Sequence, residues 1–249
     1  MAAGCSVLIA RATRSLSKTG AIAAFVAGTT ASAAGWSWAI LLISLFIAAT
    51  ALSKVRRRRK ASLVGSIVEK GGERDAWQVL ANGGVFVAAA AGYVIHPSPF
   101  WFAAAAGSLA AASADTWATE IGTLSKRDPV SIITWKRVLP GTSGGVTLAG
   151  TLGGVSGALF VAAGAWIMAW PVSFIGVAVA GIAGALTDSV LGGTLQSRRY
   201  CKRCEEFTER KIHDCGTPTT RAGGVKGMNN DVVNAICSAT GALVGLLLS

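Results

Sequence analysis

The chain has 249 residues, of which 52% are hydrophobic and 14% are charged, whereas a soluble domain carries about 25% charged residues. This composition excludes an ordinary soluble globular protein, and it excludes disorder, which needs low hydrophobicity and high charge. The formal net charge of +11 would suggest nucleic acid in a soluble chain. In a membrane chain it indicates topology and contact with anionic lipid or phosphate, so no nucleic-acid partner is expected.

Seven apolar stretches predict an all-α, polytopic integral membrane helix bundle with about six or seven transmembrane helices. They cover residues 20–34, 36–53, 78–95, 99–114, 145–169, 172–190 and 232–248. The first stretch is short and contains hydroxyl residues, so it is predicted either to span the bilayer or to be re-entrant. Glycine pairs such as Gly150/Gly154 and Gly241/Gly245 predict close helix packing. We expect one membrane domain over residues 1–249.

The basic residues divide the connecting segments into two kinds. All 23 Lys and Arg residues lie in the segments 11–18, 54–77, 126–137 and 196–227. Because positive residues stay on the cytoplasmic side, the N-terminus and these long loops are expected in the cytoplasm. The turn at Pro97 is then expected outside, and the expected membrane is the cell membrane of a prokaryote.

Four carboxylates lie where apolar stretches meet the expected cytoplasmic face. They are Asp115, Glu120, Asp188 and Asp231. Carboxylates at a membrane edge are costly and are commonly functional, although a helix cap or a buried ion pair would explain any single one. Their neighbours carry hydroxyls and amides, and such oxygen ligands suit Mg²⁺. We predict that the four carboxylates bind Mg²⁺, with Asn230 assisting.

A glycine-rich segment precedes the fifth apolar stretch. It comprises Gly141, Thr142, Ser143, Gly144 and Gly145, and it follows Lys136 and Arg137. A loop of this kind before a helix offers backbone N–H groups and a positive dipole to an anion, although an ordinary capped turn has a similar composition. It lacks the Gly-Lys-Ser/Thr of a Walker A loop. We predict that this loop binds phosphate or nucleotide together with Lys136, Arg137, Asn229 and Asn230.

A polar stripe opens the third apolar stretch. Arg74, Gln78 and Asn82 are spaced at i, i+4 and i+8, so on a helix they share one face. At membrane depth such a stripe faces a cavity or a partner, and hydrogen bonding between helices would explain it equally well. We predict that Arg74 and Asn82 belong to the phosphate-binding side of the site.

The loop 196–227 contains a cluster of potential metal ligands. Cys201 and Cys204 form a Cys-x-x-Cys pair, which His213 and Cys215 follow. This spacing is typical of a four-ligand zinc site that folds a loop. Free thiols and a redox pair are the alternatives. Because the loop is expected in the cytoplasm, disulfides are not expected.

The order of several sequence blocks resembles one membrane family, known as domain of unknown function 92, which includes transmembrane protein nineteen of animals. The blocks are GERDAWQVLANGG, SADTWATEIG, PGTSGGVTLAGTLGG, GALTDSVLGGTLQ, CKRC…HDCG and NNDVVN. The family includes the phytyl-phosphate kinase of plastids and cyanobacteria, which acts in tocopherol synthesis. The resemblance therefore implies a kinase that converts an isoprenoid monophosphate into the diphosphate with a nucleoside triphosphate, and related kinases prefer CTP.

The residues agree with this chemistry. The phosphate of a prenyl monophosphate is largely ionised near neutral pH, with a second pKa of about 6, so a strong general base is not required. Alignment and charge neutralisation of two phosphates are required. A membrane prenyl-phosphate kinase that uses Mg²⁺, a nucleoside triphosphate and a prenyl phosphate lipid is the leading hypothesis. A small transporter or flippase for an anionic lipid or metabolite and a zinc-dependent scaffold are the alternatives.

Overall fold

The computed structural model describes residues 15–55, 60, 63–64, 67 and 72–249, so half of the first basic segment and half of the second lie outside the described residues. The helices are α2 (Lys18–Ala34), α3 (Trp36–Lys54), α5 (Ala76–Ile95), α6 (Pro99–Gly122), α7 (Leu148–Ile167), α8 (Phe174–Thr194) and α9 (Asn230–Leu247). A two-stranded sheet pairs β1 (Val130–Ser131) with β2 (Gly145–Val146). A three-stranded sheet has the order β4 (Glu206–Thr208), β3 (Arg198–Cys201), β5 (Thr220–Gly223).

Helices long and apolar enough to cross a membrane confirm the predicted integral membrane bundle. In the described part of the chain five helices meet this condition, namely α3, α5, α7, α8 and α9. The stretch predicted either to span or to be re-entrant is one unbroken helix, α2, of 17 residues, which is roughly 26 Å long. Gly35 has a φ of 139° and joins α2 directly to α3, which makes the two a helical hairpin.

Helix α6 is the centre of the bundle, and small residues allow its neighbours to approach. Every residue of α6 from Ala103 to Ala114 is buried. A side chain at Gly241 of α9 would overlap the carbonyl oxygen of Gly107, and one at Gly157 of α7 would place its Cβ 2.7 Å from the carbonyl oxygen of Ser113. The predicted small-residue packing therefore brings helix backbones into direct contact.

Two helix boundaries differ from the predicted stretches. Helix α6 continues to Gly122, so Asp115 lies within the helix instead of after it. Helix α7 begins at Leu148, because Thr147 caps it and accepts a hydrogen bond of 3.0 Å from the N–H of Gly150. The residues just before this cap pair with β1 as a short hairpin, so the glycine-rich loop is held as a turn before the helix.

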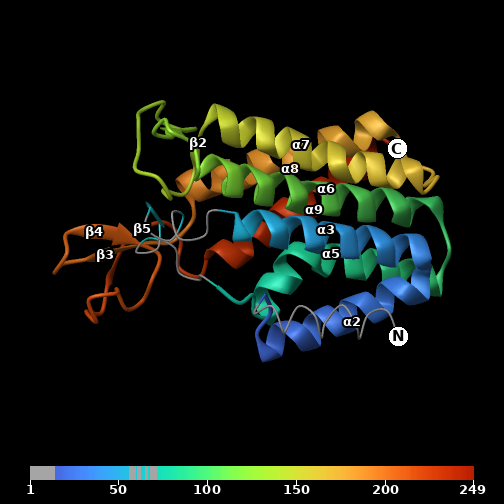
Figure 1. Ribbon diagram of the computed structural model, residues 1–249, viewed down its shortest axis with the longest axis horizontal. Coiled ribbons are helices and arrows are strands. Elements are labelled where there is room, and N and C mark those ends of the chain that lie inside the picture. Colours follow the sequence, from blue (N-terminus) through green and yellow to red (C-terminus); the bar gives the residue numbers. More distant parts are fainter. Residues whose placement is uncertain (1–14, 56–59, 61–62, 65–66, 68–71) are drawn as a thin grey trace.

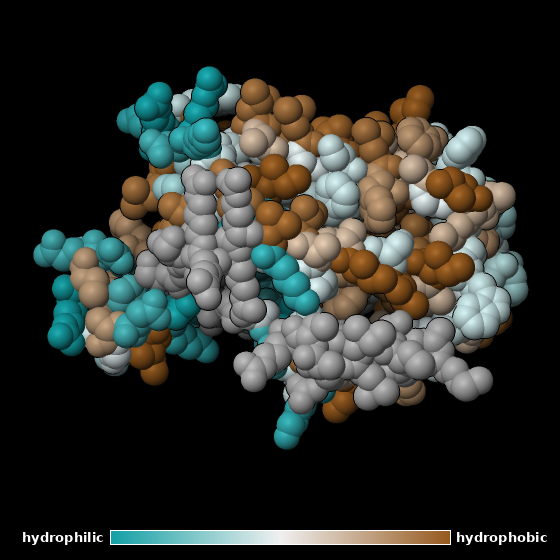
Figure 2. All heavy atoms as spheres, in the orientation of Figure 1, coloured by the Kyte–Doolittle hydropathy of each residue, from teal (hydrophilic) through white to brown (hydrophobic). Residues whose placement is uncertain are grey.

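The two ends of the bundle differ in chemistry. Figure 1 shows all five strands at one end, where α5, α7 and α9 begin and where α6 and α8 end. The short turns between helices lie at the opposite end. In Figure 2 the most hydrophilic residues gather at the strand-bearing end, whereas hydrophobic residues cover the helices. We call the strand-bearing end the basic end, because the long basic loops gather there.

Candidate functional site

A polar cavity of about 400 Å³ brings together residues from five helices at the basic end. Most of the predicted site residues line it: Arg74, Asn82, Asp115, Glu120, Gly141, Thr142, Ser143, Gly144, Gly145, Asp188 and Asn230. The alternating direction of the helices explains this gathering. Helices α6 and α8 bring carboxylates near their C-terminal ends, whereas α5, α7 and α9 bring their N-terminal turns. We call this space the polar cavity.

Asp115 and Asp188 meet because two helices touch one turn earlier. A side chain at Gly184 of α8 would overlap the Cβ of Ala111 on α6. One turn later along each helix, four residues on, the same faces carry Asp188 and Asp115. Their side chains interact directly. The small residue at 184 therefore sets the spacing of the two carboxylates.

The carboxylate pair has the properties of a cation ligand. Among the described residues, Oδ1 of Asp188 is buried and has no hydrogen-bond partner. Two carboxylates in contact repel unless a proton or a cation lies between them. Hydroxyl and amide oxygens from Thr116, Ser189 and Asn234 surround the same space, and a hard divalent cation such as Mg²⁺ prefers oxygen ligands. The donor set therefore fits Mg²⁺.

Glu120 has a partner that the sequence did not reveal. Nζ of Lys60 forms an ion pair with Oε2 of Glu120, and it also donates to the carbonyl oxygen of Leu52 at 2.6 Å. Lys60 is largely buried, although it belongs to the basic segment 54–77 that the sequence places in a cytoplasmic loop. Glu120 therefore shares its charge with a buried lysine, while Asp115 and Asp188 face each other.

Arg74 is held by its backbone at the edge of the polar cavity. Its N–H donates to the carbonyl oxygen of Ser15 at 3.1 Å, and its carbonyl oxygen accepts from the N–H of Ser17 at 3.0 Å. Gly20 allows this approach, because a side chain there would overlap the Arg74 carbonyl. Burial lowers the pKa of Arg74 below its ordinary value, and the negative charge of Glu120 opposes that shift.

The rest of the predicted polar stripe supports helix α5. Gln78 and Asp75 form a capping box, in which the Gln78 N–H donates to Oδ1 of Asp75 at 2.9 Å. Nδ2 of Asn82 donates to the carbonyl oxygen of Gln78 at 3.0 Å. These contacts fix the N-terminal turns of α5 beside Arg74, and both amide side chains still line the polar cavity.

The glycine-rich loop forms one wall of the polar cavity. The N–H groups of Thr142 and Gly145 donate within the loop, to the carbonyl oxygens of Leu139 and Thr142, so a ligand cannot use them. Gly141 and Gly144 have φ values of 85° and 78°, which a side chain would strain. The N-terminal turn of α7 continues this wall, and its positive dipole end favours an anion.

Glu209 joins this wall from the loop 196–227, and it was not among the predicted site residues. It directly follows β4, lines the polar cavity, and accepts hydrogen bonds from Oγ of Ser143 at 2.8 Å and from Nε2 of Gln196 at 2.6 Å. Gln196 is almost fully buried. The only sequence signal for Glu209 was its position in the segment that carries the Cys/His cluster.

Four predicted site residues do not line the polar cavity. Asn229 caps α9 and accepts a hydrogen bond of 3.1 Å from the N–H of Val232. Lys136 and Arg137 are exposed. Asp231 is half-buried and lies one residue after Asn230, which a helix rotates by roughly 100°. The predicted roles of these residues are therefore not supported by position in the polar cavity.

The predicted metal ligands in the loop 196–227 lie together. The ligand atoms of Cys201, Cys204, His213 and Cys215 are all within 4.8 Å of one another. Sγ of Cys215 is 3.6 Å from Sγ of Cys201 and 3.4 Å from Nδ1 of His213. Tetrahedral zinc with Zn–S bonds of about 2.3 Å places its sulfur ligands roughly 3.8 Å apart, so the spacing fits zinc.

The surroundings of this cluster also suit a metal. Hydrogen bonding with Thr217 and His213 lowers the pKa of the Cys215 thiol to about 6, and the thiolate is the form that binds metal. Oε2 of Glu206 lies 3.6 Å from Nε2, the other ring nitrogen of His213. A carboxylate in that place commonly orients a metal-binding histidine.

Comparison with known proteins gives a consistent family assignment. The family model described as "Integral membrane protein DUF92" matches residues 1–242. Protein PGR of Arabidopsis thaliana is 28% identical over 90% of this chain and 85% of its own length. An uncharacterized membrane protein of Methanocaldococcus jannaschii is 30% identical over 86% and 77%, and the chloroplastic Protein VTE6 of Arabidopsis thaliana is 27% identical over 94% and 65%. No solved structure matches.

Proposed function

Because the chain belongs to the DUF92 family of integral membrane proteins, we propose that it is a prenyl-phosphate kinase. It transfers a phosphoryl group from a nucleoside triphosphate to a membrane isoprenoid monophosphate. The resemblance of its sequence blocks to a family that includes phytyl-phosphate kinase supports the substrate class. The similarity to Protein VTE6, at 27% identity, supports the same substrate class.

The observation that carries the proposal is the distribution of charge around the polar cavity. The lining of this one space includes the carboxylates of Asp115 and Asp188 together with Arg74 and the N-terminal turns of α7 and α9. Phosphates bind at helix N-termini and at arginines, and cations bind at carboxylates. A site that aligns two phosphates with a metal ion needs both kinds of surface in one space.

The residues of the chain would bind and align, and they would not need to remove a proton. The ionised acceptor oxygen forms a bond to the γ-phosphorus, and the bond from that phosphorus to the β,γ-bridging oxygen breaks. The nucleoside diphosphate leaves with the electron pair, so no proton has to move. Arg74 would hold charge on the acceptor phosphate, while the glycine-rich loop and the α7 N-terminus would hold the nucleotide phosphates.

Magnesium belongs to this proposal as a bound ion. Asp115 and Asp188 would hold it, because their carboxylates face each other and one oxygen of Asp188 has no partner among the described residues. When bound, Mg²⁺ supplies charge neutralisation of the phosphate oxygens. Glu209 lies nearby but is already bonded to Ser143 and Gln196, so it would position the loop.

The direct experiment uses the purified protein in lipid nanodiscs. It is incubated with γ-labelled ATP, CTP, GTP or UTP, Mg²⁺, and prenyl monophosphates of different length. Formation of labelled prenyl diphosphate with one or more nucleotides is the expected result. Absence of product with all four nucleotides, from protein shown to be folded, would contradict the kinase. Movement of lipid across vesicles without nucleotide turnover would instead favour the transporter.

We also propose that zinc organises the loop 196–227 and thereby holds Glu209 at the polar cavity. The support is that the ligand atoms of Cys201, Cys204, His213 and Cys215 all lie within 4.8 Å of one another. Purified protein is expected to contain about one zinc per chain. Cys204→Ser is expected to reduce the zinc content and to expose this loop to limited proteolysis, because one of four ligands is lost.

Cys237→Ser is the matched control, since this cysteine is buried in α9 away from the cluster. Its zinc content and its proteolysis pattern are expected to equal those of the wild type. Metal-free wild-type protein with an intact, protease-resistant loop would contradict the zinc site and would favour free thiols.

We further propose that the basic end faces the cytoplasm. Pro97 is exposed in the turn between α5 and α6, which lies at the end opposite the strands, and Lys126 is exposed shortly after α6 ends at the basic end. In intact bacterial cells, a membrane-impermeant thiol reagent is expected to label Pro97→Cys. Lys126→Cys is expected to react only after permeabilisation, because positive residues are retained inside. The reverse pattern of labelling would invert the topology.

A further inference from the structure

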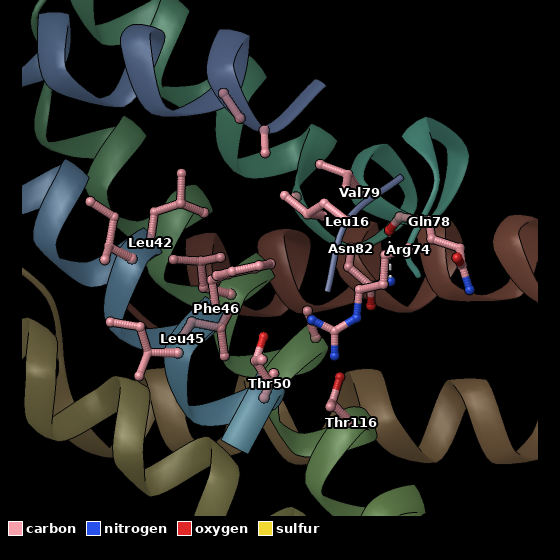
Figure 3. A pocket seen from close by; sticks show the side chains of 18 of the residues that line it. Leu16, Leu42, Leu45, Phe46, Thr50, Arg74, Gln78, Val79, Asn82 and Thr116 are labelled. Atoms are coloured by element: carbon pink, nitrogen blue, oxygen red, sulfur yellow. Dashed lines mark hydrogen bonds between the residues drawn. The ribbon is translucent and has the colours of Figure 1, made fainter. Parts of the chain in front are cut away.

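A second cavity adjoins the polar cavity and has a different chemistry. It is a groove of about 510 Å³ between α2, α3 and α5, with α6 at its base. Apart from its polar end its lining is almost wholly apolar, with Leu42, Leu45, Phe46 and Val79 among its walls (Figure 3). We call it the apolar groove.

The two cavities share one junction. Arg74, Gln78, Asn82 and Thr116 line both of them. In Figure 3 the guanidinium of Arg74 points toward Thr116. The Cζ atom of Arg74 also lies 5.8 Å from the centre of the Phe46 ring. The charged side chain of Arg74 therefore lies where the apolar groove meets the polar cavity.

We propose that the apolar groove seats the isoprenoid chain of the acceptor, with its phosphate at Arg74, and that Gly83 keeps the deeper part of the groove open. This inference rests on the proposed kinase function and adds a binding subsite and a residue that determines chain-length specificity. The proposed occupant of the groove is a single isoprenoid chain that ends in a phosphate.

Charge complementarity supports this occupant. Arg74 is half-buried, and among the described residues no carboxylate forms an ion pair with it within 4.0 Å. A cation that is partly withdrawn from water is stabilised by an anionic partner, and a phosphate at the junction supplies one. Leu16, Phe46 and Val79 begin the apolar wall close to Arg74. The chain must therefore become apolar immediately after its phosphate, as an isoprenoid ester does and as a glycerol-based lipid does not.

The groove also has a route from the bilayer. Ile47 lines it and is 60% exposed, and the outer face of α2 exposes Phe25 and Val26. In an integral membrane protein, exposed apolar side chains of this kind are expected to contact lipid. Because lipid tails are as apolar as these side chains, the groove adds little to affinity through burial alone. Its contribution is to hold the phosphate at a fixed depth beside the polar cavity.

The length of the groove identifies the position that limits the chain. It runs along α3 from Lys54 to Leu42, a rise of roughly 18 Å. With carbon–carbon bonds of about 1.5 Å, one extended isoprene unit spans roughly 5 Å. Gly83 lies seven residues into α5, roughly 10 Å from its start. A chain of two units would therefore end near Gly83, and a longer chain would pass it.

Gly83 and its neighbour provide a matched pair of variants. A Cβ at Gly83 would meet nothing within 4 Å, and one at Gly84 would meet only the Cβ of Leu80 at 4.0 Å. Gly83 lines the apolar groove, and Gly84 lines neither cavity. The Cβ of a leucine at 83 therefore meets no protein atom at the groove, whereas leucine at 84 adds the same side chain at a position that lines neither cavity.

The experiment compares Gly83→Leu and Gly84→Leu in nanodiscs, with geranyl monophosphate (two units) and geranylgeranyl monophosphate (four units) as acceptors. For Gly83→Leu, the kcat/KM ratio of the long to the short acceptor is expected to fall at least tenfold. For Gly84→Leu, this ratio is expected to equal that of the wild type. An unchanged ratio in Gly83→Leu, or an equal fall in both variants, overturns the assignment.

A second readout separates the groove from the kinase. A geranylgeranyl monophosphate with a terminal diazirine is photo-crosslinked without nucleotide, and the labelled peptides are identified. Labelling of α2 and α3 in the wild type and in Gly84→Leu, with loss in Gly83→Leu, supports the groove even if no kinase turnover is found. Labelling that is equal in all three proteins, or that lies on other helices, rejects the groove whether or not the protein is a kinase.

Discussion

Replacing Asp188 by asparagine is expected to lower kcat by roughly 10²–10³-fold, the effect of losing one preorganised electrostatic group. Asp188 contacts Asp115, and its Oδ1 is buried without a hydrogen-bond partner among the described residues. Asparagine keeps the shape and removes the charge that would hold Mg²⁺. The Mg²⁺ concentration required for half-maximal rate is expected to rise, because one carboxylate ligand is lost.

Folding of this variant is expected to survive. A neutral amide in contact with Asp115 removes a repulsion between two carboxylates, so thermal stability measured without Mg²⁺ is expected to equal or exceed that of the wild type. Thr187→Ala is the matched control on the same helix. Oγ1 of Thr187 donates to the carbonyl oxygen of Ala183 within that helix, and Thr187 does not line the polar cavity, so its kcat is expected to stay close to that of the wild type. Wild-type turnover by a well-folded Asp188→Asn protein would remove Asp188 from the site.

Replacing Arg74 by glutamine is expected to lower kcat/KM for the prenyl phosphate by about 10²-fold or more. Removing one partner of a buried charge pair costs about 2–5 kcal/mol, and the phosphate at the junction would lose its cation. The KM for the nucleotide is expected to change little, because the nucleotide phosphates are assigned to the glycine-rich loop and the α7 N-terminus. Arg74→Lys is expected to recover part of the loss, since it restores the charge but not the planar fork.

A change in the kinetics of the prenyl phosphate without a change in the nucleotide KM would assign Arg74 to the acceptor. Arg127→Gln removes an exposed arginine from a different loop at the same end, and it is expected to leave both KM values close to those of the wild type. A rise in the nucleotide KM with an unchanged acceptor KM would place Arg74 on the nucleotide instead. An equal loss of folded protein in Arg74→Gln and Arg74→Lys would indicate a structural role.

Sequence patterns were sufficient for the features that depend on local spacing. The lengths of the apolar stretches predicted the membrane helices, because a span needs about 20 apolar residues. The confinement of Lys and Arg to four segments predicted one basic end, since consecutive helices reverse direction. The spacing of Cys201 and Cys204, with His213 and Cys215 close behind, predicted a cluster that the fold does assemble.

Tertiary structure decided which of the residues at the basic end face one another. Spacing along a helix gives the face that a residue occupies, but the rotation of one helix against another depends on packing. The contact of Gly184 with Ala111 turns Asp188 toward Asp115, whereas Asp231 lies outside the polar cavity although Asn230 lines it.

Long-range contacts decided the rest. Lys60 and Glu120 are 60 residues apart and form an ion pair, and Glu209 reaches Ser143 across 66 residues. The sequence around one residue of each pair does not predict the other residue, because both pairs form only when distant segments pack. The apolar groove is likewise a space between helices. The hydropathy of the residues along each helix can predict that its walls are apolar. Its opening at Arg74, however, exists only once α2, α3 and α5 are assembled.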